Sequence, residues 1–261
     1  MIHLRNEREI EAIRQSCEIV VATLKMVNEI IEEGMTTSDL DAEIETFIRK
    51  HNARPAFKGY QGFPASACIS LNDEVVHGIP NRRRIKAGDL VKVDVGVEKD
   101  GYFGDAAMTY VMGEIDDETQ RLLRVTHEAL MLGIEQARYG NRLSDISHAI
   151  QQHVEGAGYS VVRQLVGHGI GKKLHEDPQV PNYGKPGRGP RLRPGMVLAI
   201  EPMVNAGTYD VVTDDDGWTV RSADGSLSAH FEHTVVIRKD GPEILTEGLE
   251  HIYGEKRTHS R

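Results

Sequence analysis

Cysteine and tryptophan are scarce in this chain of 261 residues, which has two cysteines and one tryptophan. Cys17 lies in a helical pattern and Cys68 in an apolar, strand-like run, so neither suggests a disulfide framework or a cysteine-based zinc site. The chain also lacks an apolar stretch long enough to span a bilayer, and its first residues are too charged for a signal peptide. We therefore expect no contact with a membrane and a cytoplasmic location.

An excess of positive charge is also missing, because the formal net charge is −9. This charge argues against a protein whose main task is binding nucleic acid or an anionic membrane. Basic residues nevertheless gather in two short segments, which are either solvated loops or a docking surface for RNA-rich machinery. These residues are Arg82, Arg83 and Arg84, and then Lys185, Arg188, Arg191 and Arg193.

The chain alternates between helical and strand-like segments. Apolar spacing predicts a helix at residues 7–33 ended by Gly34, and a second helix capped by Thr36 or Thr37. Two more helices are expected at 118–138 and 143–156, and strands at 67–71, 90–97, 102–111, 159–165, 196–200 and 229–237. This order predicts an α+β domain of two similar halves, about residues 1–115 and 116–254, with a polar tail at 255–261.

Residues 91–97 alternate between valines and polar or small residues, which predicts a strand with one apolar face. The Asp-Gly pair that follows predicts a two-residue hairpin turn, which places Gly96 opposite Asp105. Asp94 and Asp105 would then be diagonal neighbours on one face. Two like charges there cost stability unless a cation lies between them, and the missing side chain of Gly96 would leave space for one. Solvent-exposed carboxylates are the alternative.

Two histidines and two glutamates stand out in the second half. His168 and His175 lie in a glycine-rich stretch, expected to be a loop, where glycines allow backbone and ligand to approach closely. Glu201 follows an apolar strand, and Glu232 lies within the strand expected at 229–237. A carboxylate that continues a buried strand is costly unless it is paired or bound to a metal. Exposed histidines and salt-bridged glutamates are the alternatives.

These residues together suggest a metal site. Two divalent cations would neutralise the charge of the two aspartates and two glutamates, with one imidazole completing the set. Oxygen-rich ligation with one histidine suits Mn, Fe, Co or Zn. Such a pair of ions would activate a water molecule and polarise a carbonyl group.

The chain resembles type I methionine aminopeptidases in motifs spread over nearly its whole length. Besides Asp94 and Asp105, the motifs are residues 59–72 (GYQGFPASACISLN), 77–80 (HGIP), 167–171 (GHGIG), 201–202 (EP), 217–218 (GW) and 231–234 (FEHT). The resemblance implies the pita-bread fold, in which two pseudo-symmetric α+β halves surround an antiparallel sheet. The chain begins at the first family helix, so we expect the short bacterial form.

The resemblance also implies an activity, namely removal of the initiator methionine from nascent proteins and peptides when the second residue is small. Glu201 would bind metal and transfer protons, whereas His77 and His175 would contact the scissile amide without binding metal. Two divalent ions (Co, Mn, Fe(II) or Zn) would be bound, with bridging by two of the ligands, Asp105 and Glu232. The implied metal ligands are Asp94, Asp105, His168, Glu201 and Glu232.

Further expectations concern the pocket, a second kind of cation and the partners. The resemblance suggests a monovalent cation near Asn72 and Ser228, and a pocket wall altered by Phe57 and Leu174. We expect a monomer that binds nascent N-termini and docks transiently on the ribosome. The substrate-binding residues would be Tyr60, Phe63, Cys68, His77, His175 and Trp218, whose sulfur and aromatic groups suit a thioether.

Three alternatives carry different expectations. A non-catalytic relative of the same fold would lose metal ligands, and this chain has all five. A Xaa-Pro peptidase would share the ligands but lack Trp218 and the segment from Gly59 to Cys68. A pure RNA-binding protein is disfavoured by the negative net charge.

Overall fold

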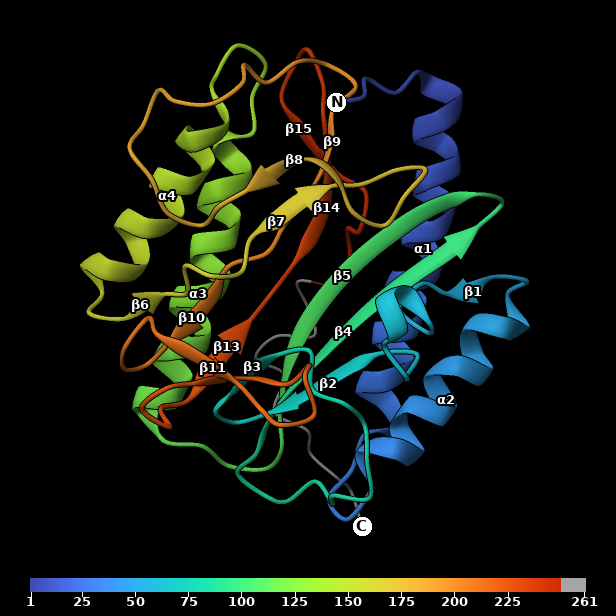
Figure 1. The fold of residues 1–261 in the computed structure, drawn as a ribbon, viewed down its shortest axis with the longest axis vertical. Coiled ribbons are helices and arrows are strands. Elements are labelled where there is room, and N and C mark those ends of the chain that lie inside the picture. Colours follow the sequence, from blue (N-terminus) through green and yellow to red (C-terminus); the bar gives the residue numbers. More distant parts are fainter. Residues whose placement is uncertain (250–261) are drawn as a thin grey trace.

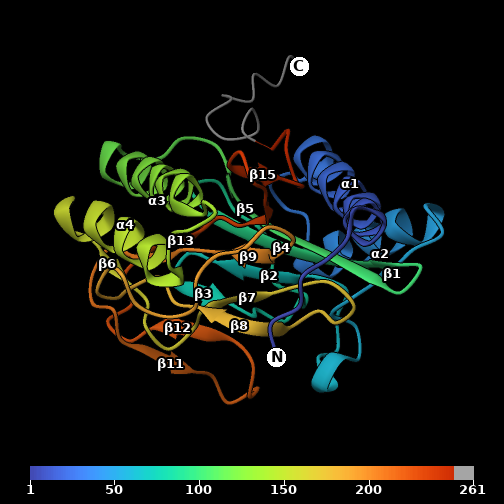
Figure 2. The same cartoon turned by 90° about the horizontal axis from the view of Figure 1, so that it is seen from above.

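Two pairs of helices cover one side of a layer of strands (Figures 1 and 2). The computed structural model describes residues 1–249, so the end of the second half and the polar tail lie outside the described residues. None of the described helices combines the length and apolar character needed to cross a membrane. The first pair is α1 (Glu7–Ile30) and α2 (Thr37–Lys50), and the second is α3 (Asp117–Gln136) and α4 (Leu143–Gly156).

The helix ends follow from local capping. Asn6 caps α1 in a capping box with Glu9. Thr36 caps α2 by accepting a hydrogen bond from the Asp39 amide, which confirms the cap expected at this helix. Each such cap stabilises a helix by about 1 kcal/mol. Helix α1 ends at Ile30, a few residues earlier than expected, because Ile31 already adopts an extended conformation.

A long hairpin dominates the first half. Strands β4 and β5 pair along their whole lengths, and β1 and β2 pair with the other edge of β4. Helix α1 packs against the hairpin, and the short 3₁₀ helix η1 (Tyr60–Gly62) lies between β1 and β2 in the chain. The strands are β1 (Arg54–Pro55), β2 (Cys68–Leu71), β4 (Leu90–Lys99) and β5 (Tyr102–Val111).

Most strands of the second half are short. A five-stranded antiparallel sheet has the order β15-β14-β9-β7-β8, and two three-stranded sheets have the orders β13-β10-β6 and β11-β12-β3. One strand of these sheets, β3 (Glu74–Val76), comes from the first half and pairs with β12. The strands of the second half are β6 (Ser160–Val161), β7 (Gly167–Gly169), β8 (Glu176–Val180), β9 (Val197–Ile200), β10 (Met203–Asn205), β11 (Val211–Thr213), β12 (Val220–Ser222), β13 (Ser228–His230), β14 (His233–Ile237) and β15 (Pro242–Ile244).

Three expectations about strands were wrong. The glycine-rich stretch is not a loop at His168, because Gly167–Gly169 forms β7. The strand expected at 159–165 is reduced to Ser160–Val161, and the strand expected at 229–237 is interrupted between β13 and β14. In each case a pairing partner from a distant segment, rather than local hydrophobicity, decides where the ladder begins and ends.

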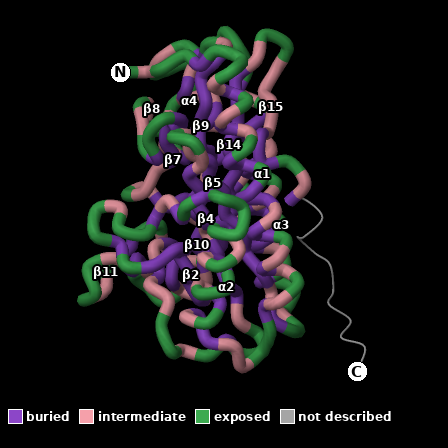
Figure 3. Tube along the Cα trace, turned by 90° about the vertical axis from the view of Figure 1, so that its right-hand side faces the viewer, coloured by how far each residue is buried: buried purple, intermediate pink, exposed green. Residues whose placement is uncertain are grey.

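The apolar core lies between the helices and the central strands, where the buried parts of the chain concentrate (Figure 3). The valines of β4 are fully buried, as their alternation predicts. The connection between the halves spans residues 112–116, between β5 and α3. The division of the domain near residue 115 remains a prediction.

Candidate metal and peptide site

A cavity of about 220 Å³ brings the expected site residues together from both halves of the chain. Every metal ligand and every substrate-binding residue that the resemblance implies lines this cavity. They are Tyr60, Phe63, Cys68, His77, Asp94, Asp105, His168, His175, Glu201, Trp218 and Glu232.

The β4–β5 hairpin has the register that the sequence predicts. Asp100 and Gly101 form its turn with φ angles of 51° and 80°, which matches the left-handed turn that an Asp-Gly pair favours. Gly96 is therefore opposite Asp105, and Asp94 is opposite Ala107. Asp94 and Asp105 thus share the face that borders the cavity.

The expected reason for Gly96 was wrong. A Cβ atom at this position would lie 2.6 Å from the ring of Phe57 and 3.1 Å from the Cβ of Ala56. The missing side chain therefore makes room for Phe57, which itself lines the cavity, and does not leave space for a cation.

Glu232 reaches the hairpin because the chain leaves the sheet at this residue. It lies between β13 and β14, not in the middle of a strand as expected, and its amide donates to the carbonyl of Ala107 at 3.0 Å. Thr234 strengthens this crossing, since its hydroxyl donates to the Asp105 carbonyl at 2.7 Å and accepts from the Asp105 amide at 3.2 Å. The two carboxylates are thereby held against each other.

His168 presents its Nε2 atom to the carboxylates. Its Nδ1 donates to the Gly169 carbonyl at 3.0 Å, and this leaves Nε2 as the ring nitrogen with a lone pair. Nε2 lies 3.5 Å from Glu201 Oε1 and 3.9 Å from Asp105 Oδ2. The glycine before His168 is required by close packing, because a Cβ at Gly167 would lie 2.4 Å from the carbonyl oxygen of Ala199.

The carboxylates repel one another. Burial, together with neighbouring carboxylates, raises the pKa of Asp105, Glu201 and Glu232 well above the usual range. Burial raises the pKa of Asp94 to about 7. It also lowers the pKa of His168 to about 3, so this histidine does not supply the missing positive charge.

The site fits divalent metal ions. Oδ1 of Asp94, Oδ1 of Asp105 and Oε1 of Glu232 are buried and accept no hydrogen bond from the described residues. One ligand atom each from Asp105, His168 and Glu232 lies within 4.8 Å of the others. Buried carboxylate oxygens without partners cost several kcal/mol in total unless a cation binds them. Asp94 and Glu201 border the same cluster and complete a set of four carboxylates and one imidazole.

His77 and His175 lie on the cavity wall beside this cluster. The ring centroids of His175 and His168 are 4.3 Å apart, and His175 Nδ1 is 2.8 Å from the Tyr60 hydroxyl. Burial lowers the pKa of His77 to about 4. His77 has a φ of 59°, a conformation that non-glycine residues rarely adopt. This strained backbone turns a polar side chain into the cavity, as is common at functional sites.

Apolar side chains also line the cavity. Phe63 and Trp218 meet edge to face with ring centroids 5.2 Å apart. Cys68 and Phe57 belong to the same apolar cluster, and Cys68 is opposite Asp94 in the β2–β4 ladder. Leu174, expected to alter the wall, is buried in the apolar cluster behind it and is not among the lining residues.

Two polar residues near the site escaped the sequence analysis. His230 is buried, and its Nε2 lies 3.9 Å from Glu201 Oε2. Lys92 is buried on β4, two residues before Asp94. The alternation of β4 places Lys92 on the same face as Asp94, and this signal could have identified it.

Known proteins resemble this chain in sequence and fold. Residues 11–239 match metallopeptidase family M24. The fold and the carboxylate cluster define a metal-dependent peptidase, and the chain belongs to this family. It is 57% identical to a methionine aminopeptidase of Clostridium acetobutylicum, over 94% of this chain and 99% of that protein. The crystal structure of methionine aminopeptidase from Rickettsia prowazekii matches with a TM-score of 0.93 and 44% identity, over 94% of this chain and 100% of that one.

A prolidase from Pyrococcus furiosus shares the fold more distantly, with a TM-score of 0.78 and 25% identity, over 94% of this chain and 65% of that one. Within family M24 the chain is therefore a member of the methionine aminopeptidases, with the pita-bread fold that the sequence predicts.

Proposed function

We propose that this chain removes an N-terminal methionine from proteins and peptides whose second residue is small. The observation that carries the proposal is a single cavity lined by two kinds of side chains. Buried carboxylates, with oxygen atoms that accept no hydrogen bond from the described residues, line it together with aromatic and sulfur-containing side chains. An apolar, polarizable pocket next to a metal site suits the thioether of a first residue.

Asp94, Asp105, His168, Glu201 and Glu232 would hold two divalent ions, for which Mn, Co, Fe(II) and Zn are the candidates. When bound, such ions lower the pKa of a water molecule and polarise the peptide carbonyl. Asp105 and Glu232, held together by the contacts of Thr234 and Ala107, are suited to bridge the ions. Glu201 lies at the edge of the cluster and would accept and return a proton.

His77 and His175 would act on the substrate and not on the metals. Both line the cavity, and the Tyr60 hydroxyl orients the ring of His175. A neutral imidazole can donate a hydrogen bond to a developing oxyanion or a proton to the leaving amine. The lowered pKa values of both histidines favour the neutral ring at pH 7.

The remainder of the peptide would run into a larger hollow of about 940 Å³. It shares Val166, His168 and His175 with the cavity, so the second residue of a substrate would lie close to the metal ligands. A second residue placed against these shared side chains supports a preference for small second residues.

In the cell, nascent N-termini in the cytoplasm would be the substrates of a monomeric enzyme. Transient docking on the ribosome is supported by the exposed side chains of Lys185, Arg188 and Arg193. Arg83 contributes less to such a surface, because it is paired with Glu74.

Three peptides test the proposal: Met-Ala-Ser, Met-Lys-Ser and Leu-Pro-Ser. With Mn, Co or Fe(II) present, Met-Ala-Ser should be cleaved fastest, and Met-Lys-Ser far more slowly. A norleucine peptide should be cleaved moderately well, since a small change in an apolar pocket costs only about 1–3 kcal/mol. A preference for Leu-Pro-Ser would overturn the proposal and indicate a proline-specific peptidase.

A further inference from the structure

Lys92 is a buried lysine whose amine contacts only backbone oxygen among the hydrogen bonds of the described residues. Its exposed fraction is 1%, and it is one of the largest fully buried side chains. Its Nζ donates to the carbonyl of Asn72 at 2.6 Å and to the carbonyl of Ser228 at 3.0 Å. A buried amine is costly unless such partners are provided, so the environment of Lys92 is built for it.

The two carbonyl groups come from different halves of the chain. Asn72 lies in the turn between β2 and β3 with a φ of 52°, and Ser228 begins β13. The Ser228 amide donates to the Asn72 carbonyl at 3.1 Å, so the two segments lie side by side. Lys92 therefore joins three elements: the strand that carries Asp94, the β2–β3 turn, and the strand that leads to Glu232.

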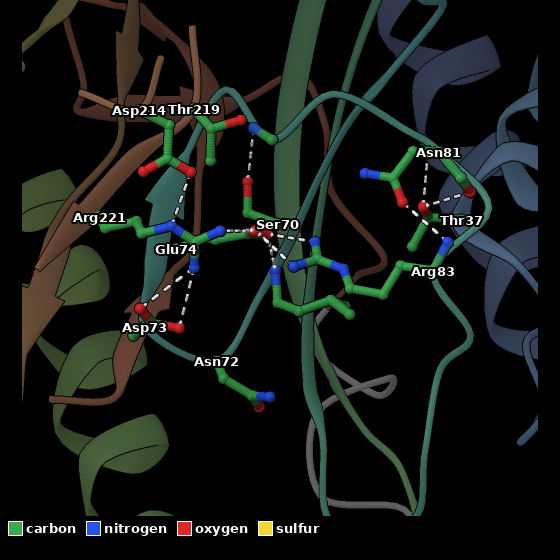
Figure 4. A network of polar contacts seen from close by, with 12 residues as sticks. Thr37, Ser70, Asn72, Asp73, Glu74, Asn81, Arg83, Asp214, Thr219 and Arg221 are labelled. Atoms are coloured by element: carbon green, nitrogen blue, oxygen red, sulfur yellow. Dashed lines mark hydrogen bonds and ion pairs between the residues drawn. The ribbon is translucent and has the colours of Figure 1, made fainter. Parts of the chain in front are cut away.

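The β2–β3 turn presents its carbonyl rigidly. The side-chain oxygen of Asn72 accepts from the Leu90 amide at 3.0 Å, and its amide group donates to Asp89 at 2.9 Å. On the other side of the turn, the Leu71 amide donates to Glu74 at 2.6 Å, and Arg83 and Arg221 bind the same carboxylate (Figure 4). The Asn72 carbonyl is thus preorganised for a positively polarised partner.

These same two residues are where the family resemblance suggests a monovalent cation. The residues present do not fit such an ion, because a cation bound to the Asn72 and Ser228 carbonyls would occupy the place of Lys92 Nζ. We propose that Lys92 Nζ replaces the monovalent cation at these two carbonyls and makes the protein independent of K⁺ and Na⁺. Lys92 is thereby a positioning residue, which holds the strand of Asp94 to the strand before Glu232.

The assignment depends on the position of Nζ and not on its titration. Burial lowers the pKa of Lys92 to about 7, and the nearby Glu74 and Asp73 act in the opposite direction. Even the neutral amine keeps two N–H groups, which is the number that the two carbonyls accept.

The test measures the apparent melting temperature of the full chain in KCl, NaCl and tetramethylammonium chloride at equal ionic strength. Tetramethylammonium has no N–H group and is too large for the site. Wild-type protein should melt at the same temperature in all three salts. A higher melting temperature in KCl or NaCl than in tetramethylammonium chloride would show an independent cation site and overturn the proposal. This measurement needs no variant.

Lys92→Ala opens the site, and Lys92→Met fills it with an apolar chain. In tetramethylammonium chloride both variants should melt roughly 5–10 °C lower than wild type, because buried carbonyl groups lose a donor. KCl or NaCl should restore about half of this loss in Lys92→Ala, since an ion can bind the freed oxygens, but not in Lys92→Met. Metal-saturated Lys92→Ala should also turn over Met-Ala-Ser faster in KCl or NaCl than in tetramethylammonium chloride.

Lys239→Met, at an exposed position, is the control. It should change neither the melting temperature nor the turnover of Met-Ala-Ser. A folded Lys92→Ala variant that responds equally to all three salts would contradict the proposal. The melting-temperature readout is separate from peptidase activity, so the inference stands or fails independently of the proposed function.

Discussion

Glu74 and Glu232 are both glutamates with 2% of their surface exposed, but their surroundings are opposite. Glu74 accepts two hydrogen bonds from Arg83, at 2.6 and 2.7 Å, and one from Arg221 at 2.8 Å (Figure 4). Oε1 of Glu232 accepts none from the described residues, and burial together with Glu201 and Asp94 raises the pKa of its carboxyl group.

The difference separates a structural carboxylate from a ligand. Around Glu74 the chain supplies its own cations, so the charge is satisfied when the protein folds. Around Glu232, the cationic side chains within 4 Å of the clustered carboxylates in the described part of the chain are histidines, His168 and His230. Burial lowers the pKa of both to about 3. Bound divalent metal would supply the positive charge that these side chains do not.

The largest effect should follow removal of metal from the Glu232 cluster. Chelation should abolish peptidase activity, and Mn, Co or Fe(II) should restore it. Asp105→Asn should lower kcat/KM at least ~10³-fold even with metal, because the proposed metal site then loses a charged ligand. The matched control is Asp214→Asn, which removes a carboxylate paired with Arg221 and should keep activity near wild type. Full activity in chelated protein would contradict the proposed metal site.

The same substitution should change stability in opposite directions at the two glutamates. In chelator at pH 8, Glu74→Gln should lower the free energy of unfolding by about 3 kcal/mol, because two arginines lose their buried partner. Glu232→Gln should raise it by about 1 kcal/mol, because one charge leaves a repelling cluster.

Urea unfolding of both variants and wild type measures these differences. Added Mn should stabilise wild type and Glu74→Gln but have little effect on Glu232→Gln. Equal losses of stability in the two variants would mean that Glu232 has an undetected partner within the chain.

Two neighbouring histidines show the same contrast. His168 faces the unpaired carboxylates, whereas His175 faces Tyr60. His175→Ala should lower kcat about 10²-fold, the lower end of the range for acid–base assistance, while metal affinity stays near wild type. His168→Ala should instead weaken metal binding. Calorimetric titration with Mn measures the metal affinity of both variants. Loss of metal from His175→Ala would refute the assignment of His175 to the substrate and of His168 to the metal.

The smallest effect is expected at the aromatic side chains of the cavity, which carry no charge. Trp218→Leu removes the edge contact with Phe63 and should raise KM for Met-Ala-Ser about 10-fold with kcat almost unchanged. Tyr209→Leu, which removes an exposed aromatic ring, serves as the control. A large fall in kcat for Trp218→Leu would show that the ring also positions the scissile bond.

Much of the first half could be predicted because its structure is local. The Asp100–Gly101 turn sets the register of the β4–β5 hairpin, so the placement of Gly96 opposite Asp105 follows from counting residues. Thr36 caps α2 through a hydrogen bond to an amide three residues away. Such features need only the conformational preferences of a few neighbouring residues.

The expectations that were wrong for Glu232 and Gly96 concern contacts between distant segments. Glu232 was expected within a strand, but its amide pairs with Ala107 and the ladder breaks there. Gly96 was expected to make room for a cation, but the ring of Phe57 fills that space. Neither Ala107 nor Phe57 could be assigned to these places from hydrophobic patterns, because patterns give the face of a strand and not its neighbour.

By itself, the sequence determined the order of α1 to α4, the β4–β5 hairpin and, through motif spacing, eleven residues that line the cavity. Only the tertiary structure decided which buried charges are satisfied within the chain. Lys92 bonds to carbonyls 20 and 136 residues away, and Glu74 is neutralised by an arginine 147 residues away. Burial makes such pairing necessary, but the partner is set by how the two halves pack, and no local pattern carries that information.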